Sequence, residues 1–115
     1  MEQAINITAT AEQMAEILKL ARNMEGVEGV SEPAALDGHR ALNAGLTPED
    51  IRAGLEVATL IFKAGGALFV FLKAVRDYLQ TSGGAVGVSD ATSSKPLGRV
   101  DATSRDETLS RLLPP

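Results

Sequence analysis

The chain contains one histidine, His39, between Asp37 and Arg40 in the segment PAALDGHRALNAG. An imidazole titrates near neutral pH, and beside a carboxylate it could act as a general base. No serine of the chain stands with it in a recognisable nucleophile signature, and a lone histidine in such a loop is usually just solvated. We therefore predict no catalytic residue, and keep a small-ligand cleft near His39 and Gly65-Gly66 only as a minor alternative.

Two further arrangements could bind ions. Glu12 and Glu16, spaced i,i+4, would place two carboxylates on one helix face, but no histidine accompanies them and the chain has no cysteine, so a solvated face is the better interpretation. Gly65-Gly66 and Gly83-Gly84 lack the Gly-Lys-Ser/Thr that completes a phosphate loop. The sequence thus predicts a protein that is not an enzyme and holds neither a metal nor a cofactor.

Composition limits the classes of protein further. The chain has 115 residues, of which 44% are hydrophobic and 23% charged, as expected for a single globular domain over residues 1–115. Its net charge of -4 and its aromatic content of 3% argue against nucleic-acid binding. The first residues, MEQAINIT, lack the basic and apolar regions of a signal peptide, so we expect a cytoplasmic protein.

The first third of the chain predicts a strand, a helix and a second strand. Apolar and polar residues alternate over residues 4–9, as in a half-buried strand. Thr10 and Gln13 form a capping box, and Met14, Ile17, Leu18 and Ala21 then recur at helical spacing until Gly26. Residues 27–32, VEGVSE, suit a short strand, so the three elements predict a crossover unit. Residues 33–45 then predict an irregular link.

The central stretch, residues 47–80, predicts one long helix or two stacked ones. Thr47 can cap it, Pro48 suits its first position, and Glu49 and Asp50 complement its dipole. Apolar residues cover about two thirds of its circumference, so it must be covered from several sides. A straight rod of this length would measure about 50 Å, against a domain diameter of roughly 35 Å. We therefore expect it to bend at Gly65-Gly66 or to project from the domain.

One narrow stripe of this predicted helix is polar or small, and it is the candidate interaction surface. Gly65 lies at the expected bend beside it, which makes the candidate set Lys63, Gly65, Gly66, Val70 and Lys73. A transmembrane span is not expected, because Glu56 and Lys63 interrupt the apolar run.

The remainder predicts a hairpin and a short helix. Thr81 to Gly84 end the central helix, and residues 85–89 can pair with residues 98–103 across a polar turn. Ser104 and Glu107 predict a capping box for a last helix, TLSRLL, whose leucines (Leu109, Leu112 and Leu113) can close the core. The predicted fold is an α+β two-layer sandwich in the order β-α-β-α(long)-β-β-α, with a central apolar helix.

The pattern around the central helix resembles the effector-associated constant component family of bacterial conflict systems. The helix reads LEVATLIFKAGGALFVFLKAVRDYLQ, and the matching positions are residues 64–68, AGGAL, with Tyr78 and Leu79 at its end. The element order agrees over nearly the whole chain, although the link at residues 38–45 is longer than in the family and Tyr78 replaces its usual tryptophan. The resemblance implies a non-enzymatic adaptor or scaffold that couples an effector or protease module to another component.

The residues leave a second function open. An apolar helix that its own chain cannot cover predicts a protein partner or a homo-oligomer. The alternative is a small membrane-active protein whose central helix oligomerises and inserts into lipid.

Overall fold

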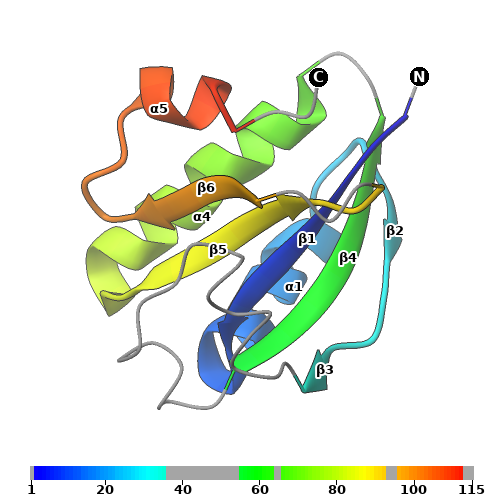
Figure 1. The fold of residues 1–115 in the computed structure, drawn as a ribbon, viewed down its shortest axis with the longest axis horizontal. Coiled ribbons are helices and arrows are strands. Elements are labelled where there is room, and N and C mark those ends of the chain that lie inside the picture. The colour runs from blue at the N-terminus through cyan, green and yellow to red at the C-terminus, as the bar shows by residue number, and fades with distance from the viewer. Residues whose placement is uncertain (1, 36–54, 64–65, 93–95, 113–115) are drawn as a thin grey trace.

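A computed structural model describes residues 2–35, 55–63, 66–92 and 96–112 as one antiparallel sheet with helices against it (Figure 1). The sheet order is β2-β4-β1-β5-β6, and a short strand, β3, also pairs with β4. The strand bounds are β1 Glu2–Thr10, β2 Val27–Val30, β3 Ala34–Ala35, β4 Leu55–Lys63, β5 Ala85–Asp90 and β6 Pro96–Asp101. The helices are α1 Ala11–Arg22, α4 Ala67–Ser82 and α5 Asp106–Ser110. The predicted α+β class is therefore confirmed.

Strand β1 and helix α1 form as predicted, whereas β2 ends at Val30 and Ala34–Ala35, within the predicted irregular link, form β3. In β1 the alternating residues Ile5, Ile7 and Ala9 are buried. The capping box is present, since Thr10 Oγ1 accepts from the Gln13 amide and Gln13 Oε1 accepts from the Thr10 amide. The four apolar residues predicted for α1 are its four buried ones.

Two crossover units interleave in the sheet. The strands β1 and β2 lie on either side of β4, while β4 and β5 lie on either side of β1. Each pair is joined through a helix, α1 in the first unit and α4 in the second, which makes a split β-α-β arrangement. Both helices lie on one face of the sheet in Figure 1, and their buried residues share one hydrophobic core with those of the strands.

The prediction of a helix throughout residues 47–80 is wrong. Residues 55–63 form β4, and helix α4 begins only at Ala67, after Gly66 with φ 97°. The β-branched residues Val57, Thr59 and Ile61 favour a strand, and β4 has neighbours on both sides. A nearly continuous apolar run fits a helix and an interior strand equally well, so periodicity alone could not separate them. The predicted helix start at Thr47 lies outside the described residues.

The turn at Gly66 also resolves the length problem. The molecule measures 35 × 29 × 24 Å, so a rod of about 50 Å could not lie within it. Instead the chain reverses, and α4 returns across the sheet: the ring of Phe71 in α4 contacts that of Phe62 in β4 at a tilt of 46°, with ring centroids 5.2 Å apart. Two phenylalanines that were expected on one helix thus come from a strand and a helix that pack together.

The C-terminal hairpin and last helix form as predicted, but α5 lies at Asp106–Ser110 and not at residues 108–113, and its cap differs. The hairpin of β5 and β6 forms, and Leu109 and Leu112 are buried; Leu113 lies outside the described residues. The predicted capping box of Ser104 is wrong, because α5 has Arg105 as its N-cap and no side chain caps it. Ser104 Oγ instead accepts a hydrogen bond from the amide of Asp101, 3.0 Å away, within the turn after β6.

We predict that Phe71→Ala lowers the free energy of unfolding by about 3 to 5 kcal/mol, because it leaves a cavity opposite Phe62. The neighbouring Val70 is exposed on the same helix, so Val70→Ala should change it by less than about 0.5 kcal/mol. Urea unfolding followed by circular dichroism measures both values. Equal losses in the two variants would contradict the described orientation of α4.

Candidate functional site

The outward face of α4 carries three of the five candidate interaction residues. Gly66, Val70 and Lys73 follow one another at helical spacing, and Gly66 and Val70 are exposed. Within the described part of the chain, Val70 is the one large apolar side chain that is exposed, with 56% of its surface accessible. Lys63 is exposed at the end of β4, and Gly65 lies outside the described residues. These three residues, Gly66, Val70 and Lys73, lie together at the surface and are called the α4 face below. Lys63 is not part of it, because it lies at the end of the strand β4.

Lys73 is fixed by its neighbours rather than free in solvent. Its Nζ lies 5.6 Å from the centroid of the Phe69 ring, within the range of a cation–π contact. The same Nζ lies 4.0 Å from Asp106 Oδ2 at the start of α5. The α4 face therefore presents an apolar side chain beside an oriented positive charge.

A second cation of α4 ties the helix to α5. Arg76 Nη1 donates to Asp106 Oδ1 and, at 3.4 Å, to the carbonyl oxygen of Ser104, while Nε donates to Asp77 at 3.2 Å. The Arg76 side chain is mostly buried, whereas Asp106 is more than half exposed. The hydrogen bond from Arg76 lowers the pKa of the Asp106 carboxyl, and the same bond raises the pKa of the guanidinium.

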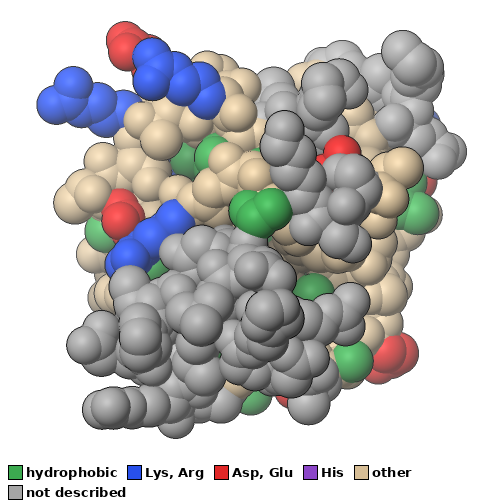
Figure 2. Space-filling model, viewed as in Figure 1, with side chains coloured by type: hydrophobic (Ala, Val, Ile, Leu, Met, Phe, Trp, Pro, Cys, Tyr) green, Lys and Arg blue, Asp and Glu red, His purple; other side chains and the backbone are tan. Residues whose placement is uncertain are grey.

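The α5 segment, residues 105–112, is held mainly by two leucines. Leu109 is fully buried and Leu112 nearly so, while the remaining six residues are exposed. Leu112 lies directly on β6 at Gly98, where an added Cβ would stand 2.3 Å from its Cδ2. Figure 2 shows basic and acidic side chains close together at the upper left, over α5. The segment is thus charged outside and attached by an apolar underside.

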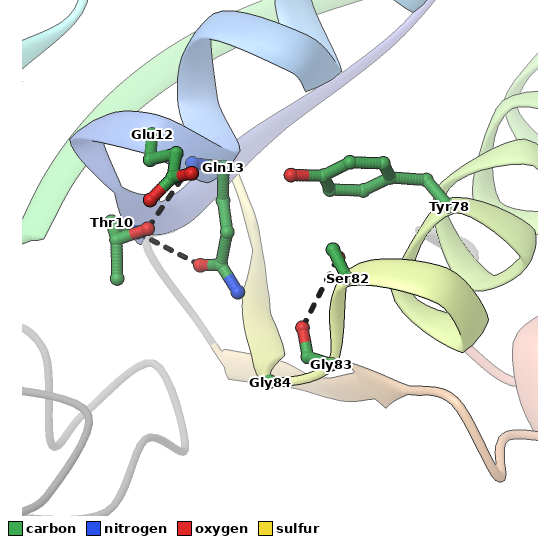
Figure 3. Close-up of a pocket in the computed structure, with 7 residues that line it drawn as sticks. All are labelled: Thr10, Glu12, Gln13, Tyr78, Ser82, Gly83 and Gly84. Atoms are coloured by element: carbon green, nitrogen blue, oxygen red, sulfur yellow. Dashed lines mark hydrogen bonds between the residues drawn. The ribbon is translucent and has the colours of Figure 1, made fainter.

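A separate pocket of about 250 Å³ lies between the start of α1 and the end of α4 (Figure 3). In the figure the Tyr78 hydroxyl points toward the first turn of α1, and the Gln13 amide faces the turn after α4. Its lining consists of Thr10, Glu12, Gln13, Tyr78, Ser82, Gly83 and Gly84. Several of these groups are already used, since Thr10 and Gln13 form the capping box and Ser82 Oγ donates to the Gly83 carbonyl at 3.2 Å. The pocket can offer hydrogen bonds, and its lining holds one carboxylate, that of Glu12, and one phenol, that of Tyr78.

Sequence reasoning missed the pocket and the Arg76 contacts. Their residues are far apart in the chain, and Arg76 and Asp106 are separated by 30 positions. Arg105 directly precedes Asp106 in the sequence, so no local signal pointed to Arg76 as its partner. His39 lies outside the described residues, so the structure does not place the proposed cleft.

The described part of the chain offers neither a metal-binding cluster nor a membrane-spanning helix. No group of three or more histidine, cysteine, aspartate or glutamate residues there is arranged to hold a metal ion. Glu12 and Glu16 are both exposed on α1. None of the helices in the described ranges is both long enough and apolar enough to cross a membrane.

The comparisons with known proteins leave the family undecided. No family model, no curated protein and no solved structure matches this chain. The resemblance to the effector-associated constant component family therefore stays a prediction.

We predict that Asp106→Asn destabilises the protein at pH 7 and that this effect depends on pH. Since folding lowers the pKa of Asp106, its stabilisation is complete above the ordinary value of about 3.9 and is lost as the pH falls through the lower folded value. The two proteins should therefore converge in stability in strongly acidic solution. Urea unfolding at pH values from about 2 to about 7 measures the difference in the free energy of unfolding between the two proteins.

Glu107→Gln is the matched control, because it removes one carboxylate from the next position, and Glu107 forms no ion pair with a described residue. Its effect should be smaller and should not follow the titration of Asp106. If the two variants gave the same pH profile, the stabilising role of the Arg76–Asp106 bond would be refuted.

Proposed function

We propose that this chain is a non-enzymatic adaptor or scaffold domain that mediates protein–protein association in a bacterial conflict or immunity system. The family resemblance supports the biological setting, with an effector or protease module as the partner. A cytoplasmic location is part of the same proposal. The observation that carries the proposal is the α4 face, where Val70 is exposed beside Lys73.

The chemistry of the α4 face suits a protein partner. An exposed valine can serve as an apolar anchor that becomes desolvated on binding. Lys73, already oriented by Phe69 and Asp106, loses little conformational freedom on meeting an acidic group of the partner. The face is small, so on its own it suits a transient complex better than an obligate one.

The lipid-inserting alternative depended on a continuous helix over residues 47–80. In the structure nine residues of that stretch form the strand β4, and α4 buries Leu68, Phe71, Leu72, Val75 and Leu79 in the core. Insertion would require α4 to leave these contacts. The adaptor proposal needs no such rearrangement, which is why we favour it.

We predict that Val70→Glu weakens partner binding, or self-association if the partner is a second copy, by at least about tenfold, because it places a charge at the apolar anchor. The fold should persist, since Val70 is exposed. Lys19→Glu on α1 is the control, because it changes an exposed residue elsewhere on the surface. Light scattering over a range of concentrations measures self-association. Affinity isolation compares the proteins retained by the three forms.

A complex kept by the unaltered chain and by Lys19→Glu but lost with Val70→Glu would support the proposal. If each form stays a monomer and retains the same proteins, the α4 face is not an association surface. Release of dye from liposomes by the purified unaltered chain would instead favour the membrane alternative.

A further inference from the structure

We propose that the α5 segment is an internal ligand, which occupies a seat for a partner helix that carries two leucines three residues apart and an acidic residue before them. The seat is formed by α4 and β6, and the partner would displace the α5 segment from it. The inference rests on the proposed function in one respect, which is that the chain binds a protein partner.

The seat is shaped for a leucine. Gly98 of β6 has no side chain, and Leu112 occupies the space beside it. A Cβ added at Gly98 would stand only 2.3 Å from Leu112 Cδ2. Leu109, one helical turn earlier, is fully buried beside it in the same core. The spacing of these two leucines defines the pattern that a competing helix must reproduce, because residues three apart lie on the same helix face.

The seat also has a charged rim. Arg76 donates to Asp106, and Lys73 lies 4.0 Å from the same carboxylate. Asp106 stands three residues before Leu109, so the bound pattern reads Asp-x-x-Leu-x-x-Leu. An acidic residue at that position in a partner would meet the same two cations. The charge complementarity therefore selects an acidic rather than a basic helix.

The α5 segment is suited to leave. Its helix has five residues, whereas an isolated helix needs about 12 to 15 to be even marginally stable. No side chain caps its N-terminus, and its link to α4 at the rim is an ion pair with an exposed carboxylate. Because so few contacts hold it, it should open locally while the sheet remains folded.

The seat and the α4 face lie next to each other. Lys73 belongs to the α4 face and also contacts Asp106, so a partner lying along α4 would reach both. Figure 1 shows α5 beside α4 at the edge of the molecule, where displacement would not cross the sheet. The partner helix is thus placed to compete with the α5 segment directly.

The test uses full-length protein and a fluorescent peptide with the sequence of residues 103–115, TSRDETLSRLLPP. In a variant with Leu109→Ser and Leu112→Ser the seat is intact but its own leucines are removed. We expect fluorescence anisotropy to show at least about tenfold tighter peptide binding by this variant than by the unaltered chain, since the internal competitor is disabled. Adding Gly98→Val to the variant should remove the gain, because its side chain takes the place of Leu112. Since Gly98 has φ 153°, this comparison requires that the added substitution leave the circular dichroism spectrum unchanged.

A peptide with the same two leucines replaced by serine is the matched control and should not bind. Equal binding of the peptide by the unaltered chain and by the folded variant would refute the internal-ligand role. So would the absence of binding by that folded variant. A dimer formed by exchange of α5 segments, detected by light scattering, would also overturn the inference, since the seat would then serve a second copy.

Hydrogen exchange in the unaltered chain decides the question if the variant does not fold. The amides of Leu109 and Leu112, which donate to Arg105 and Leu109 carbonyls, should exchange at least about 100-fold faster than the protected amides of β1. Exchange of both sets at the same rate would mean that the α5 segment opens only on global unfolding. Because these measurements leave Val70 unchanged, failure here is distinguishable from failure of the proposed function.

Discussion

The ladder between β1 and β4 is the interaction on which the rest of the structure depends. It pairs nine residues of each strand, from Glu2 opposite Lys63 to Thr10 opposite Leu55. On one side β4 carries β2 and β3, and on the other side β1 carries β5 and, through it, β6. The helix-facing residues of the two strands, including Ile5 opposite Leu60 and Ile7 opposite Ala58, form the floor on which α1 and α4 pack.

The position of this ladder also determines where α4 presents its outward face. Gly66 turns the chain from β4 into α4, and Phe62 and Phe71 then set how the helix lies on the sheet. The buried residues Leu68, Leu72 and Val75 lie on one side of α4, and Val70, about 200° around the helix from Leu68, points away from them. The exposure of Val70 is therefore a consequence of the core and not of the surface around it.

Local signals predicted those elements that depend on local chemistry. The Thr10 capping box, the burial of the apolar side of α1 and the hairpin of β5 and β6 are each encoded within a few residues. The central stretch was different, because whether residues 55–63 are helical depends on β1, whose nearest paired residue is 45 positions away. The stripe of Gly66, Val70 and Lys73 was nevertheless predicted, since these three residues lie at the start of or within α4 and keep helical spacing there.

The contacts around α5 were beyond the reach of local reasoning for a related reason. Ser104 and Glu107 satisfy the pattern of a capping box, yet the hydroxyl of Ser104 bonds to Asp101. Arg76 then meets the start of α5 through Asp106. A side chain with several possible hydrogen-bond partners bonds to the one that the fold brings close in a suitable geometry. Sequence spacing does not reveal which partner that is.

The interleaving of β1 between β4 and β5 has a consequence for how the chain reaches its fold. The ladder joins residues between 45 and 61 positions apart, so β1 must remain unpaired until the second half of the chain is available. Closing loops of that length before any ladder contact forms makes such topologies slow to fold. During that interval the alternating apolar residues of β1 form an open edge, which is a template for pairing with other chains. The most central strand of the finished sheet is thus the most vulnerable segment during its assembly.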